Sequence, residues 1–225
     1  MDIHKPKPWH GLREFLKEYL IIVVGVLTAL AAEQAVEWAH RHEEVAGARD
    51  ALHQEIAIDL RTLILELRDN ECYERRTEAI GSWARGERER PMRGQGGLMS
   101  GLTSTNWETV KAGAVAHMPL EERLTLGAFY SGVENQRELI QQLRLESQDL
   151  AGYLRRETLD DQEKHALIRL TGNAAATMHA LSRNVPDLLA TGRRLGVSPA
   201  PPRRERETWV DNLCSAYPPL PKSGA

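Results

Sequence analysis

The residues of this chain that come closest to a chemical site are a carboxylate and an imidazole on one helical face. Glu37 and His40 form an E-x-x-H spacing, which supplies metal ligands in di-iron helical bundles. That site needs a second copy of the spacing and further carboxylates on facing helices, and the two later long helical segments contain no second copy. We therefore expect no metal, and we expect Glu37 to pair with Arg41 one turn further on.

Other catalytic signatures are incomplete. The glycine-rich residues 94–97 (GQGG) lack the lysine and hydroxyl that end a phosphate-binding loop, and no serine stands in a G-x-S-x-G turn. His117, His165 and His179 are isolated from one another in sequence. We expect no cofactor and no enzymatic reaction. The formal net charge of −3 also gives no electrostatic footprint for nucleic acid.

The most specific feature is the uncharged apolar run of residues 19–32, YLIIVVGVLTALAA. Fourteen helical residues rise only about 21 Å against a hydrocarbon core of about 30 Å. Extending the helix over residues 16–38 closes the gap, because long charged side chains at its ends can reach the headgroups. Trp9, Tyr19 and Trp38 suit the aromatic belts of a bilayer. We expect residues 1–15 to be a cytoplasmic segment and residues 16–38 to be a transmembrane anchor.

The distribution of basic residues predicts the orientation of this anchor. Within about twenty positions of the ends of the apolar run, the N-terminal flank contains Lys5, Lys7, Arg13 and Lys17, and the C-terminal flank contains Arg41 and Arg49. The positive-inside rule places the N-terminus in the cytoplasm and the remainder in the periplasm, with the anchor in a bacterial inner membrane. The alternative is a cleaved signal peptide, since Ala29 and Ala31 form an A-x-A pattern. Removal of residues 1–31 stays open from the sequence.

Small residues in the anchor predict a surface for packing two copies together. Gly25, Ala29 and Ala32 recur at steps of four and three, which lets helices approach closely in a membrane. Glu33 lies at the hydrocarbon edge, where it either pairs with a polar side chain of a neighbouring copy or extends toward the headgroups. A homo-oligomer is therefore one expected assembly.

The rest of the chain has helical periodicity and no extended alternation of period two. The apolar positions at steps of three or four are Val45, Ala48, Leu52, Ile56, Leu60, Leu63 and Leu67, then Leu126, Tyr130, Val133, Ile140, Leu143, Leu150 and Leu154, then Leu167, Leu170, Ala174, Met178, Leu181, Val185 and Leu188. The second set has near-heptad spacing, as in a coiled coil. Ser104 or Thr105 is placed to cap a short helix around Trp107, and Asp160 or Asp161 to cap the last long one.

These elements predict an all-α fold in which one N-terminal transmembrane helix continues into an antiparallel helical bundle. The bundle covers residues 39–196, with a glycine-rich loop at residues 86–102. Pro186 predicts a kink or a break near the end of the last long helix, which Gly192 and Gly196 finish. Residues 197–225 form a proline-rich tail containing a short helix over residues 205–213 and a disordered end.

The two cysteines, Cys72 and Cys214, allow one intramolecular pairing. A disulfide between them would close a loop of about 140 residues and fits an oxidising periplasm. The alternative is two unrelated thiols, one in a helix and one in the tail. No C-x-x-C or Cys/His cluster points to redox catalysis or zinc.

The N-terminal sequence resembles a family of uncharacterised bacterial single-pass inner-membrane proteins. The resemblance lies in LREFLKEYLIIVVGVLTALAAEQAVEW (residues 12–38) and more weakly in TSTNWETVKAGAVAHM (residues 103–118), together under a quarter of the chain. It implies an anchored helical protein and brings no activity, cofactor or catalytic residue.

Two functions fit these features. The first is a membrane-anchored, noncatalytic helical protein that docks to or scaffolds an envelope complex, or self-associates. The second is a periplasmic, sensor-like bundle that binds a small molecule near Trp107, Tyr130 and Met178 and signals through a partner. The expected partners are thus a membrane together with a protein or a second copy.

Overall fold

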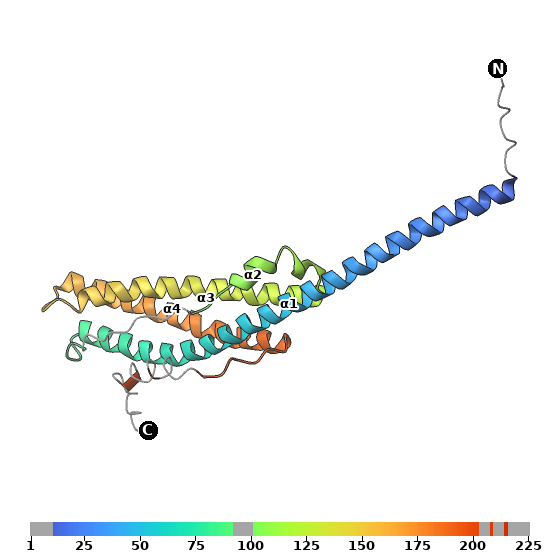
Figure 1. Cartoon of the computed structure of the whole chain (residues 1–225). Helices are drawn as coiled ribbons and strands as arrows, with labels where there is room; N and C mark the ends of the chain where they lie inside the picture. The colour runs from blue at the N-terminus through green and yellow to red at the C-terminus, as the bar shows by residue number, and fades with distance from the viewer. Residues whose placement is uncertain (1–10, 92–100, 203–207, 209–213, 216–225) are drawn as a thin grey trace, which may run out of the picture. The chain divides into compact units, whose positions relative to one another are not determined.

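The computed structural model describes residues 11–91, 101–202, 208, 214 and 215. They contain α1 (Leu12–Ala84), α2 (Thr105–Val110), the 3₁₀ helix η1 (Ala114–His117), α3 (Leu120–Tyr153) and α4 (Asp161–Arg194), drawn in Figure 1. Among these residues there is no β-strand. The prediction of an all-α protein is confirmed for this part of the chain. Most of the predicted tail helix over residues 205–213, the predicted disordered end and most of the glycine-rich loop lie outside the described residues.

The chain divides into two compact units, residues 1–47 and residues 48–225. In the first unit, α1 carries an 18-residue window whose length and composition allow it to cross a membrane, and none of this window is buried by protein. Leu20, Ile22 and Leu27 are exposed there. It belongs to the one helix of the described chain that meets this test.

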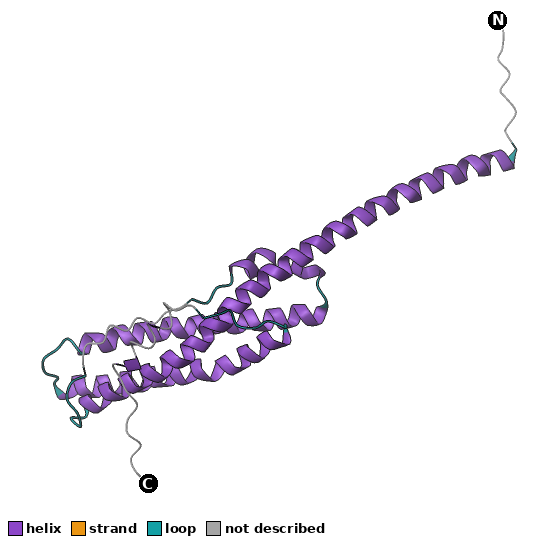
Figure 2. Ribbon diagram, turned by 60° about the horizontal axis from the view of Figure 1, so that its bottom comes forward, coloured by secondary structure: helices purple, strands orange, loops and turns teal. Residues whose placement is uncertain are grey.

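The second unit has a hydrophobic core built from residues 48–84 of α1 together with α3 and α4, which lie side by side in Figure 2. The predicted apolar faces supply this core, because residues three or four apart share one side of a helix. Its largest fully buried side chains are Phe129, Leu52, Ile56, Leu60, Leu63, Ile80, Leu126, Leu143, Leu154, Leu167, Met178 and Leu181. Val45, Leu67 and Leu170, which the same periodicity predicts, are only partly buried.

Contacts between the long helices follow a regular order. As the residue number rises along α1 or α3, the number of the α4 residue that it contacts falls. The pairs are Leu60 with Gly192, Asn70 with Ser182 and Gly81 with Thr171, then Gly132 with Leu188, Gln136 with Leu181 and Gln142 with Thr177.

The ends of α4 follow the sequence prediction. Asp160 is the N-cap, and its side chain accepts a hydrogen bond from the Glu163 amide while Glu163 accepts one from the Asp160 amide. At the other end Gly196 has φ +73°, and Val197 donates to the Gly192 carbonyl, which closes a Schellman turn. Pro186 lies inside α4 and does not break it, since the helix continues to Arg194.

Candidate functional site

Helix α1 carries a row of buried carboxylates through the second unit. Glu55, Asp59, Glu66 and Asp69 follow one another at steps of four, seven and three, which places them on one side of the helix. Glu55, Asp59 and Asp69 are 5%, 0% and 6% exposed, and Glu66 is partly buried. Buried carboxylates are uncommon unless they are paired, so each one needs an account of its partners.

Glu55 caps α2 from outside that helix. Its Oε2 accepts a hydrogen bond from the Asn106 amide at 2.9 Å and its Oε1 accepts one from the Trp107 amide at 3.4 Å. These are the amides that an N-cap side chain would satisfy. Ser104 is the N-cap residue as predicted, but its hydroxyl makes no capping bond and instead accepts from Arg137 Nη1. The expected local cap is therefore wrong, because a carboxylate of α1 takes both amides.

Asp59 holds the chain just before α2. Its Oδ1 accepts a hydrogen bond from the Thr103 amide at 3.0 Å, while the side chain of Asn106 donates to the carbonyl of Ala51. The second oxygen of Asp59, Oδ2, is buried without a hydrogen-bond partner among the described residues. Together with Glu55, Asp59 fixes residues 103–107 against α1.

The middle of the row faces α3. Gln136, on α3, donates from Nε2 to Glu66 Oε2 at 3.5 Å and to the Leu181 carbonyl at 3.3 Å. Glu66 Oε1, Asp69 Oδ1 and the hydroxyl of Tyr73 are buried without a hydrogen-bond partner in the described part of the chain. A buried carboxylate with so few donors favours its neutral form.

Burial dominates the titration of Asp59, Glu66 and Asp69. Desolvation raises the pKa of Asp59 to about 7 and that of Asp69 to about 7. The pKa of Glu66 is raised to about 8, first by desolvation and then by the nearby Asp59 and Asp69 charges, against the hydrogen bond from Gln136. Carboxyl groups with such pKa values can exchange protons near neutral pH. Asp59 is fully buried, so it is placed to respond to pH within the fold and not to reach an external substrate.

Sequence reasoning missed this row. The sequence patterns indicated Glu33, Glu37 and His40 as candidate residues and gave no separate prediction for the acidic residues between positions 55 and 69. A signal was present, because Glu55 and Asp59 stand next to the buried Ile56 and Leu60. Acidic residues that keep step with an apolar face predict buried carboxylates. The hydrogen-bond donors that bind these carboxylates lie far from them in sequence, so the local pattern does not identify them.

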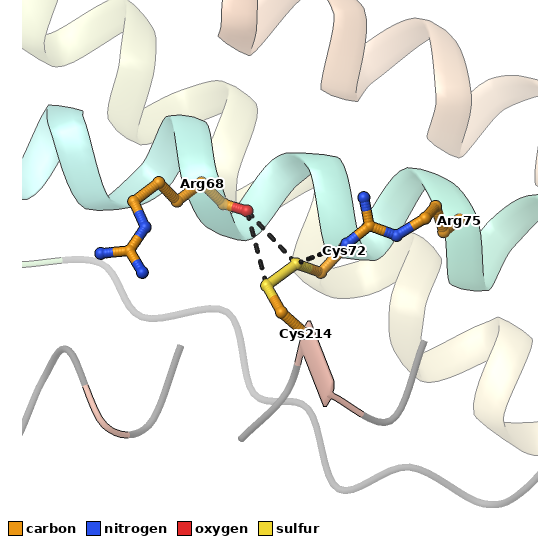
Figure 3. The surroundings of a disulfide bond; sticks show 4 residues. All are labelled: Arg68, Cys72, Arg75 and Cys214. Atoms are coloured by element: carbon orange, nitrogen blue, oxygen red, sulfur yellow. Dashed lines mark hydrogen bonds between the residues drawn. A yellow bond between two sulfur atoms is a disulfide. The ribbon is translucent and has the colours of Figure 1, made fainter. Parts of the chain in front are cut away.

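The second feature of α1 is a disulfide. Cys72 and Cys214 are bonded to each other, as Figure 3 shows. Their Cα atoms are 5.1 Å apart, and their sequence separation is 142. Cys72 is 1% exposed and Cys214 is partly exposed. Nη2 of Arg75 donates to Cys72 Sγ at 3.2 Å, and the Arg68 carbonyl oxygen lies 3.3 Å from the same sulfur. The predicted pairing is confirmed.

The predicted ligand-pocket residues lie in two places. Trp107 and Tyr130 stack with ring centroids 4.8 Å apart and an interplanar angle of 11°. Met178 is fully buried in α4. The contacts of Thr177 with Gln142 and of Leu181 with Gln136 set Met178 beside residues 136–142 of α3, several residues beyond Tyr130. This arrangement does not favour a single pocket lined by Trp107, Tyr130 and Met178.

The predicted anchor residues lie in the apolar part of α1. Gly25, Ala29, Ala32 and Glu33 are all exposed, and the space that a Cβ on Gly25 would occupy has no neighbour within 4 Å. Their role in packing two copies stays a prediction. One turn further on, Arg41 and Glu37 form the expected ion pair at 3.4 Å.

A groove opens on the second unit beside the start of α3. It has a volume of about 920 Å³, and its lining includes Arg49, His53, Leu120, Glu122, Leu124 and Arg194. The guanidinium of Arg49 makes two hydrogen bonds to Glu122, at 2.7 and 2.9 Å. This pair lowers the pKa of Glu122. The pair joins α1 to α3. Because the two opposite charges neutralise each other, the pair leaves little net charge for a ligand.

In the described residues, the secondary structure is helical, one helix is long and apolar enough to cross a membrane, and a disulfide links α1 to Cys214 in the second unit. No protein-family model, no curated protein and no solved structure matches the chain. In the part of the chain that the structure describes, no group of three or more His, Cys, Asp or Glu side chains could hold a metal ion. The function is therefore inferred from the contacts of the chain itself.

Proposed function

We propose that this chain is a membrane-anchored, noncatalytic helical protein that docks to or scaffolds an envelope complex, or self-associates. The observation that carries the proposal is the apolar window of α1, none of which is buried by protein. Leaving such a surface in water is costly, at about 25 cal/mol for each Å² of apolar area. A bilayer removes that cost, so the segment of residues 16–38 serves as the anchor.

The orientation and compartment are part of the same proposal. Within about twenty residues of the anchor, more lysines and arginines lie on its N-terminal side than on its C-terminal side, which favours a cytoplasmic N-terminus and a periplasmic second unit in a bacterium. The disulfide supports this orientation, because disulfides persist in the periplasm and are rare in the cytosol. Residues 12–38 also support placing the chain with the uncharacterised single-pass inner-membrane proteins that they resemble.

In this proposal the second unit is an antiparallel helical bundle. The order of contacts supports it, since residue numbers fall along α4 as they rise along α1 and α3. The Arg49–Glu122 and Glu66–Gln136 pairs support α1 and α3 running in the same direction. A bundle tied in this way presents a fixed surface to a partner.

A structural role of the polar groups supports a noncatalytic function. Glu55 and Asp59 bind backbone amides, and Arg49 and Glu122 bind each other. The sensor-like alternative has less support, because Met178 lies apart from Trp107 and Tyr130. The groove beside Leu120 is large enough for a small molecule and is the place where that alternative would be tested first.

Site-specific photocrosslinking in intact cells tests the interaction function. A photoreactive residue replaces Leu124 or Leu145, which are 64% and 63% exposed on α3, and the control replaces the fully buried Phe129. We expect at least one exposed position to give a crosslinked band above the monomer, and mass spectrometry of that band separates a second copy from another envelope protein. Monomer alone from both exposed positions and from a further scan of exposed α4 positions would contradict the proposal.

A further inference from the structure

The two sulfurs of the disulfide differ in what surrounds them. Cys72 lies on the buried side of α1 and is 1% exposed, whereas Cys214 is partly exposed. A thiolate from another molecule must approach a sulfur directly in order to attack it. Access therefore favours attack on Cys214 Sγ and makes Cys72 the leaving group.

The leaving group has a cation beside it. Arg75 lies three residues after Cys72, and its Nη2 donates to Cys72 Sγ at 3.2 Å, as Figure 3 shows. A guanidinium at this distance stabilises a thiolate by a charge-assisted hydrogen bond. The Arg68 carbonyl oxygen lies 3.3 Å from Cys72 Sγ and 3.8 Å from Cys214 Sγ, where it can accept a hydrogen bond from a thiol once the bond is cleaved. Reduced forms of both cysteines thus have polar partners already in place.

We propose that the Cys72–Cys214 bond is an exchange site for dithiol reductants, in which Cys214 is the attacked sulfur and Arg75 stabilises the departing Cys72 thiolate. In the first step a thiolate of the dithiol bonds to Cys214 Sγ, and the electron pair of the broken S–S bond goes to Cys72 Sγ. In the second step the other thiolate of the reductant attacks the sulfur bonded to Cys214 and expels the Cys214 thiolate, which takes a proton from water. The reductant leaves as a disulfide, and the chain has gained two electrons.

The consequence is a covalent tie that a reductant can open. The bond joins α1 to a residue 142 positions further on, so cleavage removes the covalent link between Cys214 and the helix. This property is independent of where the chain resides, because it depends on contacts of Cys72, Arg75 and Cys214 alone. It goes beyond the proposed anchoring function and can fail or succeed separately from it.

Mapping the first adduct tests which sulfur is attacked. Purified oxidised full-length chain in detergent is treated briefly with glutathione, quenched with an alkylating reagent and digested for peptide mass spectrometry. We expect glutathione on Cys214 and the alkyl group on Cys72. Glutathione mainly on Cys72 would overturn the proposal.

Reduction kinetics with dithiothreitol test the part played by Arg75. We expect Arg75→Ala to slow reduction by about three- to tenfold and Arg75→Lys to slow it less, because a cation near a leaving thiolate speeds its departure. The matched control is Arg68→Ala, one turn away, whose side chain extends away from both sulfurs in Figure 3. Circular dichroism of the oxidised proteins checks that all variants fold, and Arg75→Lys serves if Arg75→Ala does not. Equal rates for the wild type, the Arg75 variants and Arg68→Ala would refute the role of Arg75.

Discussion

Asp59 Oδ1 accepts a hydrogen bond from the backbone amide of Thr103 at 3.0 Å, across 44 positions of sequence. The carboxylate is fully buried, and its Oδ2 has no hydrogen-bond partner among the described residues. The Asp59 side chain thus binds the backbone at Thr103 to α1, and at the same time it is a carboxyl group that burial removes from water. The contact and the burial act in opposite directions on stability, and substitutions can separate them.

Asp59→Asn is expected to keep the contact and remove the charge. The amide oxygen of asparagine can still accept from Thr103, so at pH 8 this variant should be at least as stable as the wild type. Asp59→Ala loses the acceptor and should be less stable than Asp59→Asn by about 1 to 2 kcal/mol. Urea unfolding in detergent, followed by tryptophan fluorescence, measures both. Equal stability of the two variants would show that the Thr103 contact contributes nothing.

The buried acids predict that the second unit loses stability as pH rises. Desolvation raises the folded-state pKa of Asp59 and Asp69 to about 7 and that of Glu66 to about 8. Between about pH 4 and pH 8 the folded chain therefore binds more protons than the unfolded chain, and its stability falls with rising pH. Glu122 has a lowered pKa and acts in the opposite sense, but its contribution is lost only at more acidic pH.

Unfolding free energies at pH 5 and pH 8 test this direction. We expect a decrease on the order of a few kcal/mol from pH 5 to pH 8. Glu66→Gln should make the dependence shallower, because it removes one of the three titrating groups. A free energy of unfolding that is flat or rises over this range would contradict the raised pKa values of Asp59, Glu66 and Asp69.

Charged substitutions on α3 test the core. Leu143 is 1% exposed and Leu145, two residues further on, is 63% exposed. We expect Leu143→Asp to unfold the second unit, since an unpaired buried carboxylate costs several kcal/mol against a typical total stability of about 5 to 15. Leu167→Asp on α4 should do the same, whereas Leu145→Asp should melt within about 2 °C of the wild type. Circular dichroism melts decide, and a native-like melt for Leu143→Asp would mean that the core is placed wrongly.

Two glycines of α4 test how closely it packs on α1. A Cβ on Gly192 would lie 2.7 Å from Cδ1 and 2.8 Å from Cδ2 of Leu60, which is fully buried. Gly192→Ala should therefore destabilise the unit by about 1 to 3 kcal/mol through overpacking. At Gly172 nothing lies within 4 Å of the added Cβ, so Gly172→Ala should stabilise it by about 0.5 to 1 kcal/mol. Chemical denaturation of both variants gives the comparison, and a stabilising Gly192→Ala would rule out the close contact.

Local patterns were sufficient for much of this fold. The apolar faces of α1, α3 and α4 and the Asp160 cap all follow from residues within a few turns of one another. The disulfide also followed, because two cysteines permit one pairing. The continuity of α4 through Pro186 could not be predicted in this way. The proline removes one backbone amide donor, and the helical residues on both sides of it outweigh that loss.

The polar contacts of the second unit depend on residues distant in sequence. The cap of α2 comes from Glu55, some fifty residues before it, so the local choice of Ser104 or Thr105 could not reveal it. Met178 shares an apolar pattern with its neighbours on α4, but only the register of α4 on α3 separates it from Tyr130. Sequence periodicity gives the face of a helix and leaves its register against other helices undetermined.

Membrane fractionation with intact-mass analysis tests the anchor most directly. Cells expressing the full chain are lysed, the membranes are washed with alkaline carbonate, and the protein is weighed by mass spectrometry in pellet and supernatant. The proposed anchor predicts the full-length mass in the washed pellet. A soluble product whose mass corresponds to a chain that starts near Ala32 would contradict the anchor and would identify the apolar run as part of a cleaved signal peptide.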